Sequence, residues 1–446
     1  MRMKSSSHTA PTIAATEADL RGRRVAGGKK ECRVAILGFG TVGSSVARIL
    51  SERRSTGLHL THIYNRNVER KKVDWLPPGV RWTSDIQDIL SSDVDVVAEL
   101  VGGLQPAGDW IRSALGSGKS VVTANKQLIA HHGPELLHLA RANKRHLYFG
   151  ASVAGGVPVI SGLHEGLAGD ELFKIYGILN GTCNYILTRM ENAGVSFQTA
   201  LAEAQKLGFA EADPTEDVDG LDARAKLAIL SRGALHSDIT PGNIACRSIT
   251  PVDAVDFNYA RLLDCTIRQI SWAQLEEGHL FAAVQPALVR LDSPLAGVDG
   301  GQNLVMATGK FGGETVFGGH GAGGHPTAVA VVSDIIAIAR APEGGMNGFA
   351  HIRETSPPIS SDFTTRHYLR FTVMDRPGII AAIATILSHC GINLDSVLQK
   401  PGFPKTALPF VITLETCKAS LVEEALHQIS KLDFLVQPCL HLPILE

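Results

Sequence analysis

The sequence lacks the marks of a disulfide-stapled, zinc-binding or membrane-spanning protein. Its seven cysteines are scattered, odd in number and never spaced as C-x-x-C, which argues for a reducing compartment and against structural disulfides and zinc sites. No run approaches the ~20 apolar residues that cross a bilayer, and the first residues lack the apolar core of a secretory signal. We therefore expect a cytoplasmic protein with no membrane partner.

An excess of one charge is also missing. The 42 Lys and Arg residues nearly balance the 44 Asp and Glu residues, and no long basic stretch contains interleaved aromatics, so we expect no nucleic-acid partner. The 17 histidines do not show the carboxylate spacing of a catalytic zinc site. Because a domain usually takes ~150 residues, a chain of 446 residues predicts two or three domains.

Hydrophobic patterning divides the N-terminal part of the chain. Residues 1–30 have no sustained hydrophobic period, so we expect a disordered tail. Residues 31–150 alternate short apolar runs with helix-length segments, which predicts an α/β fold with a Rossmann-type doubly wound parallel sheet. A segment at 326–341 is apolar at helical spacing, and we expect it to return to this domain and complete it.

The C-terminal part has other patterns. Residues 151–325 mix long amphipathic helices with strand-like runs, which predicts an α+β domain, and residues 342–364 are rich in Gly, Pro, Ser and Thr, as in a linker. Residues 365–446 follow the order strand, helix, strand, strand, helix, strand, with the last strand expected at 435–441. This βαββαβ order predicts a ferredoxin-like fold.

A glycine pattern in the first domain indicates a dinucleotide site. Gly38, Gly40 and Gly43 form G-x-G-x-x-G between a predicted strand at 34–37 and a predicted helix at 41–53. The first glycine permits the tight turn, the second lets the backbone approach a pyrophosphate, and the third allows close helix-strand packing. We expect cofactor contacts along the whole turn, at Gly38, Phe39, Gly40, Thr41, Val42 and Gly43.

The choice of dinucleotide depends on the end of the second predicted strand. The acidic residue that usually binds the ribose of NAD is missing there, and Arg66 follows the strand instead, with more basic residues at 70–72. A guanidinium suits the 2′-phosphate, so we favour NADP over NAD. The alternative is that these residues form only a solvated basic helix start.

An acidic stretch in the second domain carries the strongest signal for a catalytic site. Residues 211–226 hold six carboxylates and one lysine, and an apolar helix follows. If Asp222 begins that helix, it shares a face with Lys226 at the i,i+4 spacing. The alternative is a solvated acidic loop with a surface salt bridge. Because the helix looks mostly buried, so many carboxylates beside it would be costly without a ligand. We therefore favour a polar site for an amino-acid ammonium group.

A second lysine follows another predicted strand. Lys126 lies just past the strand at 120–123, and the carboxyl edge of an open α/β sheet is where ligands bind. If Lys126 lay near Lys226, each ammonium would disfavour protonation of the other, which would help a lysine move protons near neutral pH. Oxidation of an alcohol by hydride transfer needs such a group.

Six motifs together resemble one enzyme family. They are GFGTVG at 38–43, ELVGG at 99–103, TANK at 123–126, NGTCNYI at 180–186, LGFAEADPTEDVDGLDARAK at 207–226 and GAGGHPTA at 321–328. From about residue 33 to 341 the chain resembles homoserine dehydrogenase. The resemblance implies NAD(P)-dependent interconversion of L-homoserine and L-aspartate 4-semialdehyde, in the biosynthesis of threonine, methionine and isoleucine. It also implies that residues 151–325 bind substrate and mediate dimerisation.

The resemblance assigns roles to the charged residues. It implies that Lys226 donates and accepts the proton and that Asp222 orients it or the substrate. Glu211 and Asp217 would hold the amino group and hydroxyl of homoserine, and Lys126 would lie between substrate and nicotinamide. The resemblance also implies contacts to the substrate and the cofactor from Thr182 and Gly323.

The resemblance also implies a cation site and an effector site. A sodium-like ion would bind backbone carbonyls of Gly150, Val153, Gly155 and Val157, although the family commonly has Glu where this chain has Gly150. The motifs at 373–379 and 390–393 resemble an ACT domain, for which the expected effector is threonine. Its contacts would be Asp375, Gly378 and Asn393, shared across a domain pair in a homodimer or homotetramer. The alternative is a purely structural ACT domain.

Two other functions compete with this hypothesis. Aspartate-semialdehyde dehydrogenase needs a nucleophilic cysteine, for which Cys183 is the only candidate inside a motif. A buried, inert thiol is the more common role of such a residue. A pathway sensor with an inactive Rossmann domain is the second competitor. The presence of all the charged residues above argues against it, because burying each of them is costly.

Overall fold

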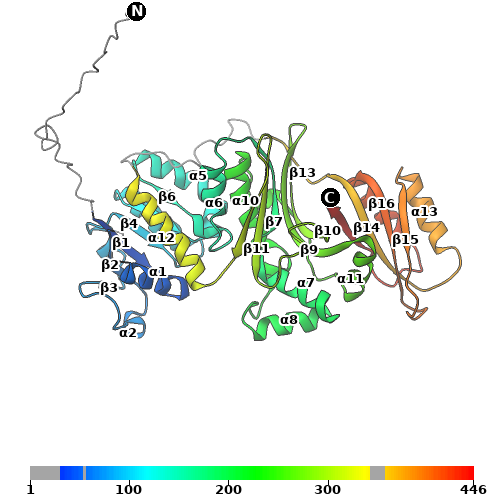
Figure 1. Ribbon diagram of the computed structural model, residues 1–446, viewed down its shortest axis with the longest axis horizontal. Helices are drawn as coiled ribbons and strands as arrows, with labels where there is room; N and C mark the ends of the chain where they lie inside the picture. Colours follow the sequence, from blue (N-terminus) through cyan, green and yellow to red (C-terminus); the bar gives the residue numbers. More distant parts are fainter. Residues whose placement is uncertain (1–30, 54–56, 342–356, 446) are drawn as a thin grey trace, which may run out of the picture.

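The structure is a computed structural model that describes residues 31–53, 57–341 and 357–445. The predicted tail at 1–30 lies outside the described residues, as do residues 342–356 of the predicted linker. Three parts follow one another along the long axis of the molecule (Figure 1). They are a parallel sheet flanked by helices, a second sheet with helices on one side, and a C-terminal domain that continues this second sheet.

The first sheet has the Rossmann strand order. Among the described residues, six parallel strands run β3-β2-β1-β4-β5-β6, which is the doubly wound order, so the predicted fold class is confirmed. The sequence pattern missed only the three-residue strand β3. The strands are β1 (Cys32–Leu37), β2 (Leu58–Tyr64), β3 (Arg81–Thr83), β4 (Val96–Glu99), β5 (Ser120–Thr123) and β6 (Leu147–Tyr148).

Helices cover both faces of this sheet. The central strands β4 and β5 are buried along their whole length, which explains their continuous apolar character. Helix α12, 17 residues long and far away in the sequence, packs beside α1 and shares its apolar core with the strands. The helices are α1 (Thr41–Glu52), α2 (Val68–Lys71), α3 (Gln87–Leu90), α4 (Ala107–Gly116), α5 (Lys126–Ala142) and α12 (Gly324–Arg340).

The second sheet contains longer, mostly antiparallel strands. The strand-like runs expected within residues 151–325, at 172–179, 283–290 and 303–308, are strands, but β8, β9, β12 and β13 were not predicted, and β13 lies in the predicted linker. Strand β9 is buried on both faces for most of its length and so lacks the alternation that marks a half-exposed strand. The strands are β7 (Leu172–Ile178), β8 (Ala245–Cys246), β9 (Cys265–Glu276), β10 (His279–Arg290), β11 (Gln302–Gly309), β12 (Gly313–His320) and β13 (Ile359–Ser360).

The helices of this part lie on one side of its sheet. Helix α10 is buried along most of its length and contacts both α5 of the Rossmann domain and strands β7 and β9. It therefore joins the two units. The helices are α6 (Val159–Ser161), α7 (Gly181–Ala193), α8 (Phe197–Lys206), α9 (Thr215–Val218), α10 (Leu221–Leu235) and α11 (Ala254–Ala260), with short turns η2 (Gly150–Ser152), η3 (Gly162–Gly166), η4 (Pro241–Asn243) and η5 (Arg261–Leu263).

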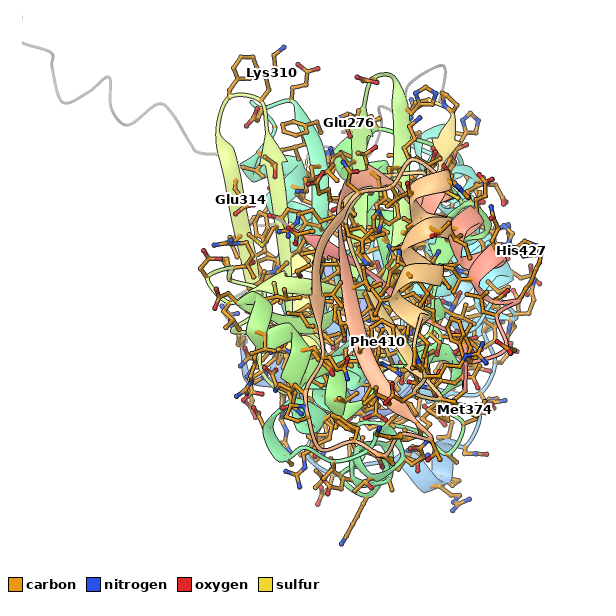
Figure 2. The ribbon with its side chains drawn as sticks, turned by 90° about the vertical axis from the view of Figure 1, so that its right-hand side faces the viewer. Glu276, Lys310, Glu314, Met374, Phe410 and His427 are labelled. Atoms are coloured by element: carbon orange, nitrogen blue, oxygen red, sulfur yellow. The ribbon has the colours of Figure 1, made fainter. Side chains whose placement is uncertain are left out.

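The C-terminal domain has the predicted ferredoxin-like order. Its strands run β17-β14-β16-β15, and Figure 2 looks onto this domain, with Phe410 in its sheet and His427 at its flank. The expected last strand at 435–441 was wrong in position. Pro438 has no amide hydrogen for a ladder, so Leu435 makes an isolated bridge and the strand begins at Leu440. The elements are β14 (Thr364–Val373), α13 (Ile379–His389), β15 (Leu394–Leu398), β16 (Leu408–Lys418), α14 (Ala419–Ile429) and β17 (Leu440–Leu445).

The C-terminal domain is joined to the second sheet without a break. Strand β17 pairs in parallel with β10, so the described strands of both units form one continuous sheet. A buried ion pair reinforces this junction, because Arg370 Nε donates to Asp256 Oδ1 of α11 at 2.7 Å. The Tyr368 hydroxyl donates to the same oxygen at 2.7 Å. Within the described ranges, no helix is both long and apolar enough to span a membrane.

Candidate active site

The Gly-rich turn forms the cradle that the dinucleotide motif predicts. Gly38 has a φ of +99°, and a Cβ at Gly43 would lie 2.0 Å from the carbonyl oxygen of Gly38, so neither position tolerates a side chain. A Cβ at Gly40 would instead face open space. The turn therefore presents backbone and the N-terminus of α1 to a free volume, as binding of a pyrophosphate requires.

The other predicted residues of this turn differ in what they expose. Thr41 is exposed at the start of α1 and Val42 is half-buried, whereas the Phe39 ring is buried and contacts the Trp82 ring, with centroids 4.8 Å apart. Only the backbone of Phe39 remains for a ligand. Gly323 caps α12 and lies close to this turn. The next residue, Gly324, is so near α1 that a Cβ there would lie 2.9 Å from Thr41 Cγ2.

Arg66 lies where the sequence pattern places it, in the turn just after β2. Its side chain is exposed, and among the described residues it forms no ion pair. The strand itself ends at the buried Tyr64, and Asn65 uses its side-chain oxygen to accept from the Asn67 amide. Residues 65–67 at this edge of the sheet thus carry a guanidinium and no carboxylate.

A buried carboxylate brings both predicted lysines together. Asp222 Oδ1 lies 2.7 Å from Lys126 Nζ at the start of α5, and Asp222 Oδ2 lies 2.8 Å from Lys226 Nζ one turn along α10. Only 8% of the Asp222 side chain and 14% of the Lys226 side chain are exposed. Lys226 Nζ also donates to the Leu179 carbonyl at 2.8 Å. The surface salt bridge that was considered as an alternative is therefore excluded.

The two ammonium groups reverse the effect of burial on Asp222. Burial alone would raise the pKa of its carboxyl, but the charges of Lys226 and Lys126 outweigh this and hold the pKa below its usual value. The expectation that the lysines disfavour each other's protonation was wrong for Lys126. Burial would lower its pKa, but the Asp222 carboxylate between the lysines overrides burial and raises it.

Asn180 is a site residue that the sequence analysis missed. Its Nδ2 donates to Asp217 Oδ1 at 2.7 Å and to Asp222 Oδ2 at 2.9 Å, so one amide bridges two carboxylates. Its Oδ1 accepts from the Cys183 amide and caps α7. Burial raises the pKa of Asp217, and the Asn180 hydrogen bond opposes this. An Asn in the NGTCNYI motif at 180–186, a residue type that often caps helices, was the available signal.

Of the two other predicted substrate contacts, Glu211 lies apart from this cluster, and Thr182 lies beside Asp217, where its side chain opposes the rise in the pKa of that carboxyl. Glu211 is exposed, and among the described residues only its backbone carbonyl accepts a hydrogen bond, from Gln205 Nε2 at 3.0 Å. The Thr182 hydroxyl donates to the Phe209 carbonyl at 2.8 Å, which ties the first turn of α7 to the start of the acidic loop. The structure brings together Asp217, Asp222 and the two lysines, but not Glu211.

Two of the recognised motifs position Lys126. Glu99, fully buried at the end of β4, accepts from the Thr123 hydroxyl of β5 at 2.6 Å. Thr123 Oγ1 accepts from the Asn125 amide, and Asn125 Nδ2 donates to the Gly103 carbonyl at 2.6 Å. Because Asn125 also caps α5, this network fixes the residue directly before Lys126.

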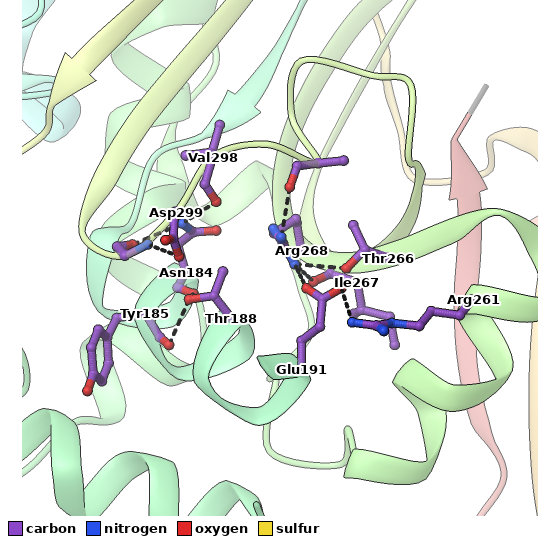
Figure 3. Close-up of polar contacts among 12 residues, drawn as sticks. Asn184, Tyr185, Thr188, Glu191, Arg261, Thr266, Ile267, Arg268, Val298 and Asp299 are labelled. Carbon is purple, nitrogen blue, oxygen red and sulfur yellow. Dashed lines mark hydrogen bonds and ion pairs between the residues drawn. The ribbon is translucent and has the colours of Figure 1, made fainter. Parts of the chain in front are cut away.

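The loop between β10 and β11 is tied to the helix that carries Asn180. Figure 3 shows Asn184 of α7 donating to the carbonyl of Val298, and it donates to that of Gly300 as well. The guanidinium of Arg268 holds Glu191 of α7 at 2.9 Å. The same guanidinium donates to the Ala296 carbonyl of the loop at 2.8 Å, so the loop is held along α7, from Asn184 in its first turn to Glu191 in its last.

Cys183 cannot serve as a nucleophile in this structure. Its side chain is fully buried, and its thiol donates to the Asp217 carbonyl at 3.1 Å. Burial raises the thiol pKa well above its ordinary value, so the reactive thiolate is disfavoured. The chemistry of aspartate-semialdehyde dehydrogenase therefore lacks its central group here.

The predicted cation turn folds around a buried acid from α12. Asp334 Oδ2 accepts from the Gly150 amide at 2.7 Å, and a Cβ at position 150 would lie 2.9 Å from Asp334 Oδ1. The acid therefore occupies the space that a side chain at residue 150 would need, which explains the glycine. Burial raises the pKa of Asp334 to about 7. The Val157 carbonyl already accepts from the Val159 amide at 2.8 Å.

The predicted effector residues do not meet within one chain. Asp375 and Gly378 lie in the exposed loop before α13, whereas Asn393 follows this helix and donates to Glu415 Oε2 at 3.1 Å. The 11 residues of α13 separate the two groups by about 16 Å. The Asp375 amide donates to the Lys405 carbonyl at 2.7 Å.

Comparisons with known proteins agree with this geometry. The family models described as "Homoserine dehydrogenase, NAD binding domain", "Homoserine dehydrogenase" and "ACT domain" match residues 38–150, 158–336 and 367–434. The homoserine dehydrogenase of Bacillus subtilis (strain 168) is 37% identical over 403 residues, which cover 87% of this chain and 93% of that protein.

Solved structures are similar as well. The crystal structure of a homoserine dehydrogenase from Thiobacillus denitrificans matches with a TM-score of 0.84 at 33% identity, over 93% of this chain and 98% of that one. A hyperthermophilic archaeal homoserine dehydrogenase in complex with NADPH matches with a TM-score of 0.60 at 29% identity, over 70% of this chain and 99% of that one.

A Gly-rich turn on a Rossmann sheet, together with a buried cluster of lysines and a carboxylate, defines a nicotinamide-dependent dehydrogenase. Within this class, the chain belongs to the homoserine dehydrogenase family and carries a C-terminal ACT domain. The resemblance seen in the sequence motifs is confirmed. The sensor hypothesis has no support in the site, because the lysines and the carboxylate are assembled.

The pH dependence of stability tests the environment of Asp334. Its pKa of about 7 exceeds the ~3.9 of an unfolded aspartate, so between these values the folded protein holds a proton that the unfolded chain has lost. The contribution of Asp334 to stability therefore falls as pH rises from about 4 to about 7. Because Asp334→Asn stays neutral, we expect its melting temperature to exceed that of the wild type at pH 8 and the difference to shrink toward pH 5.

Asp264→Asn makes the same chemical change at an exposed position and serves as the control. Its melting curve should follow the wild type across the pH range. A constant offset between Asp334→Asn and wild type at all pH values would show that Asp334 is ionised throughout.

Proposed function

We propose that the protein catalyses the NAD(P)-dependent interconversion of L-homoserine and L-aspartate 4-semialdehyde in the biosynthesis of threonine, methionine and isoleucine. The observation that carries this proposal is the buried Asp222 carboxylate shared by Lys126 and Lys226. This cluster places a lysine that can transfer protons at the edge of the dinucleotide-binding sheet. The homoserine dehydrogenases to which the chain is similar support the substrate pair.

Lys226 is the proposed proton donor and acceptor for the substrate hydroxyl. When bound, the nicotinamide supplies or accepts the hydride. The Lys226 ammonium has three donors, and contacts to the Leu179 carbonyl and to Asp222 use two of them. The third donor is left for the substrate oxygen, to which Nζ gives a proton on reduction and from which it takes one on oxidation. Asp222 keeps the amine oriented in both states.

The other polar residues hold the substrate. Asp217 is the proposed partner of the homoserine amino group, because its half-buried carboxylate forms no ion pair within the described ranges and an ammonium would offset its burial. Glu211 and Thr182 complete the substrate site, for which Glu211 must turn inward from its exposed position. Lys126 is proposed to lie between substrate and nicotinamide.

NADP is the proposed cofactor, with NAD as the alternative. The residues present fit a dinucleotide, because the cradle at Gly40 is open and Arg66 has no competing ion pair among the described residues. The archaeal relative that binds NADPH supports this choice. Its proposed contacts are Gly38, Phe39, Gly40, Thr41, Val42, Gly43, Arg66, Lys126 and Gly323.

A sodium-like ion is proposed at the turn that precedes α6. Its ligands would be the backbone carbonyls of Gly150, Val153, Gly155 and Val157. The positive φ of 53° at Gly155 and the buried Asp334 carboxylate beside Gly150 support a site that attracts a cation. The hydrogen bond that the Val157 carbonyl already accepts leaves it one free lone pair.

The domains divide this work. We propose a cofactor unit at 31–150 completed by 326–341, a substrate-binding and dimerisation unit at 151–325, a linker at 342–364 and an ACT unit at 365–446. All seven cysteines lie in described ranges and none is joined in a disulfide bond, which suits the cytoplasm. A homodimer or homotetramer is proposed because Asp375 and Asn393 can share an effector only across two ACT domains.

Turnover by the purified protein is the direct test of the function. We expect oxidation of NADPH in the presence of L-aspartate 4-semialdehyde, and we expect Lys226→Ala to lower kcat by at least about 100-fold because the proton-transfer group is gone. Binding of NADPH, measured by fluorescence titration, should stay within about twofold, since Lys226 lies outside the cradle.

Lys206→Ala removes an exposed lysine from α8 and is the matched control, with kcat expected to equal that of the wild type. Full turnover by Lys226→Ala would refute the assigned role. The lack of any turnover by the wild-type protein would refute the proposed activity.

Cofactor preference tests the role of Arg66. We expect Arg66→Ala to raise the KM for NADPH about tenfold and to leave the KM for NADH nearly unchanged, because only the former carries the 2′-phosphate. Arg141→Ala, at an exposed position on α5, is the control and should change neither value. An equal loss for both cofactors would contradict recognition of the 2′-phosphate.

Inhibition by L-threonine tests the role of the ACT domain. We expect L-threonine to inhibit the wild-type protein, and Asp375→Ala together with Asn393→Ala to abolish this inhibition without loss of basal activity, because both residues lie far from the catalytic lysines. Initial rates at increasing L-threonine measure this, with L-serine as the control ligand. The absence of inhibition in the wild type would favour the structural role for the ACT domain.

A further inference from the structure

A short segment connects the acidic loop of the site to the ACT domain. It comprises residues 245–250, which begin with strand β8 and are called the bridge segment here. On its inner side the Val218 carbonyl accepts from the Ile249 amide at 3.0 Å and from the Ser248 hydroxyl at 3.1 Å. Val218 directly follows Asp217, so the bridge segment holds the backbone beside a proposed substrate ligand.

Arg247 points from this segment to the ACT domain. Its amide donates to the Val284 carbonyl of β10, which fixes the backbone. Its guanidinium donates through Nη2 to Glu423 Oε1 of α14 at 2.5 Å, and Nη1 lies 3.0 Å from His441 Nδ1 of β17. One side chain therefore contacts both a helix and a strand of the ACT domain.

Two buried histidines extend this contact across the ACT sheet. His441 Nε2 lies 2.9 Å from His367 Nδ1 of β14, and His367 Nε2 lies 3.1 Å from the Cys417 carbonyl of β16. Burial and the Arg247 charge lower the pKa of His441, and burial lowers the pKa of His367, which favours the neutral form of each ring. With Arg247 donating to Nδ1, each ring donates from Nε2, and the chain of hydrogen bonds is consistent along its length.

We propose that Arg247 is a positioning residue that couples the ACT domain to the substrate site. The bridge segment would transmit a displacement of α14 or β17 to Val218, and thereby to Asp217. This inference rests on the proposed assignment of Asp217 to substrate binding. It predicts that a charge change on the ACT surface alters the affinity for homoserine while affinity for the cofactor stays constant.

The position of Glu423 makes such a change possible without disturbing the core. Its side chain is 60% exposed, and it borders an interdomain groove of about 750 Å³ that Arg247 and His427 also line. Figure 2 shows His427, one turn further along α14, at the outer flank of the ACT domain. A lysine at 423 therefore displaces no buried side chain while it remains beside Arg247.

The experiment compares two neighbouring charge reversals in the full-length protein. Glu423→Lys places a cation against Arg247, whereas Glu424→Lys makes the same change at the next, exposed residue of α14, which has no contact with Arg247. We expect Glu423→Lys to raise the KM for homoserine about threefold or more, with the KM for NADP unchanged and kcat within about twofold. Glu424→Lys should match the wild type. In an Arg247→Gln background, Glu423→Lys should add no further effect, because the repelled cation is gone.

Equal KM values for the Glu423→Lys and Glu424→Lys variants would overturn the proposal, as would an additional effect in the Arg247→Gln background. Circular dichroism and the melting temperature check that each variant folds. If Glu423→Lys does not fold, Glu423→Gln replaces it, with a smaller rise in the KM for homoserine expected and an unchanged KM overturning the proposal. Lys226→Ala in the same assay separates a failure of the proposed function from a failure of this inference. Its retained turnover would refute the site assignment and this inference with it, whereas its loss leaves the KM comparison to decide.

Discussion

The active site depends on one buried carboxylate that two lysines from different units share. Asp222 and Lys226 lie on α10, and Lys126 is the first residue of α5 in the Rossmann domain. Removing the Asp222 charge would leave the two ammonium groups without a counter-charge. The packing of α10 against α5 is therefore a condition for the chemistry as well as for stability.

Around this cluster, hydrogen bonds from other polar side chains hold the charged residues in place. Asn180 holds two carboxylates close together that would otherwise repel each other, and the Glu99 network holds the residue before Lys126. Each of these side chains sits at the end of a strand or the start of a helix, where backbone groups lack partners. Side-chain hydrogen bonds also connect the acidic loop, through the bridge segment, to the ACT domain, whose strands extend the second sheet.

Much of this organisation was predictable from the sequence. Alternating apolar runs predicted the Rossmann sheet, and the i,i+4 spacing predicted the contact between Asp222 and Lys226. Strand β9 was missed because burial on both faces removes alternation, and the start of the last strand was misplaced because Pro438 interrupts an apolar run. Asn180 was missed because its role depends on two carboxylates, 37 and 42 residues away, whose positions only folding defines.

The sequence by itself determined which local elements form and which chemistry is available, because periodicity, turn glycines and charge spacing act over a few residues. Only the tertiary structure decided how Lys126 titrates, since its raised pKa comes from a carboxylate on another unit. It also decided why residue 150 is glycine, because Asp334 from α12 fills the space of a side chain there. Such effects depend on distances between segments far apart in the chain, which no local pattern encodes.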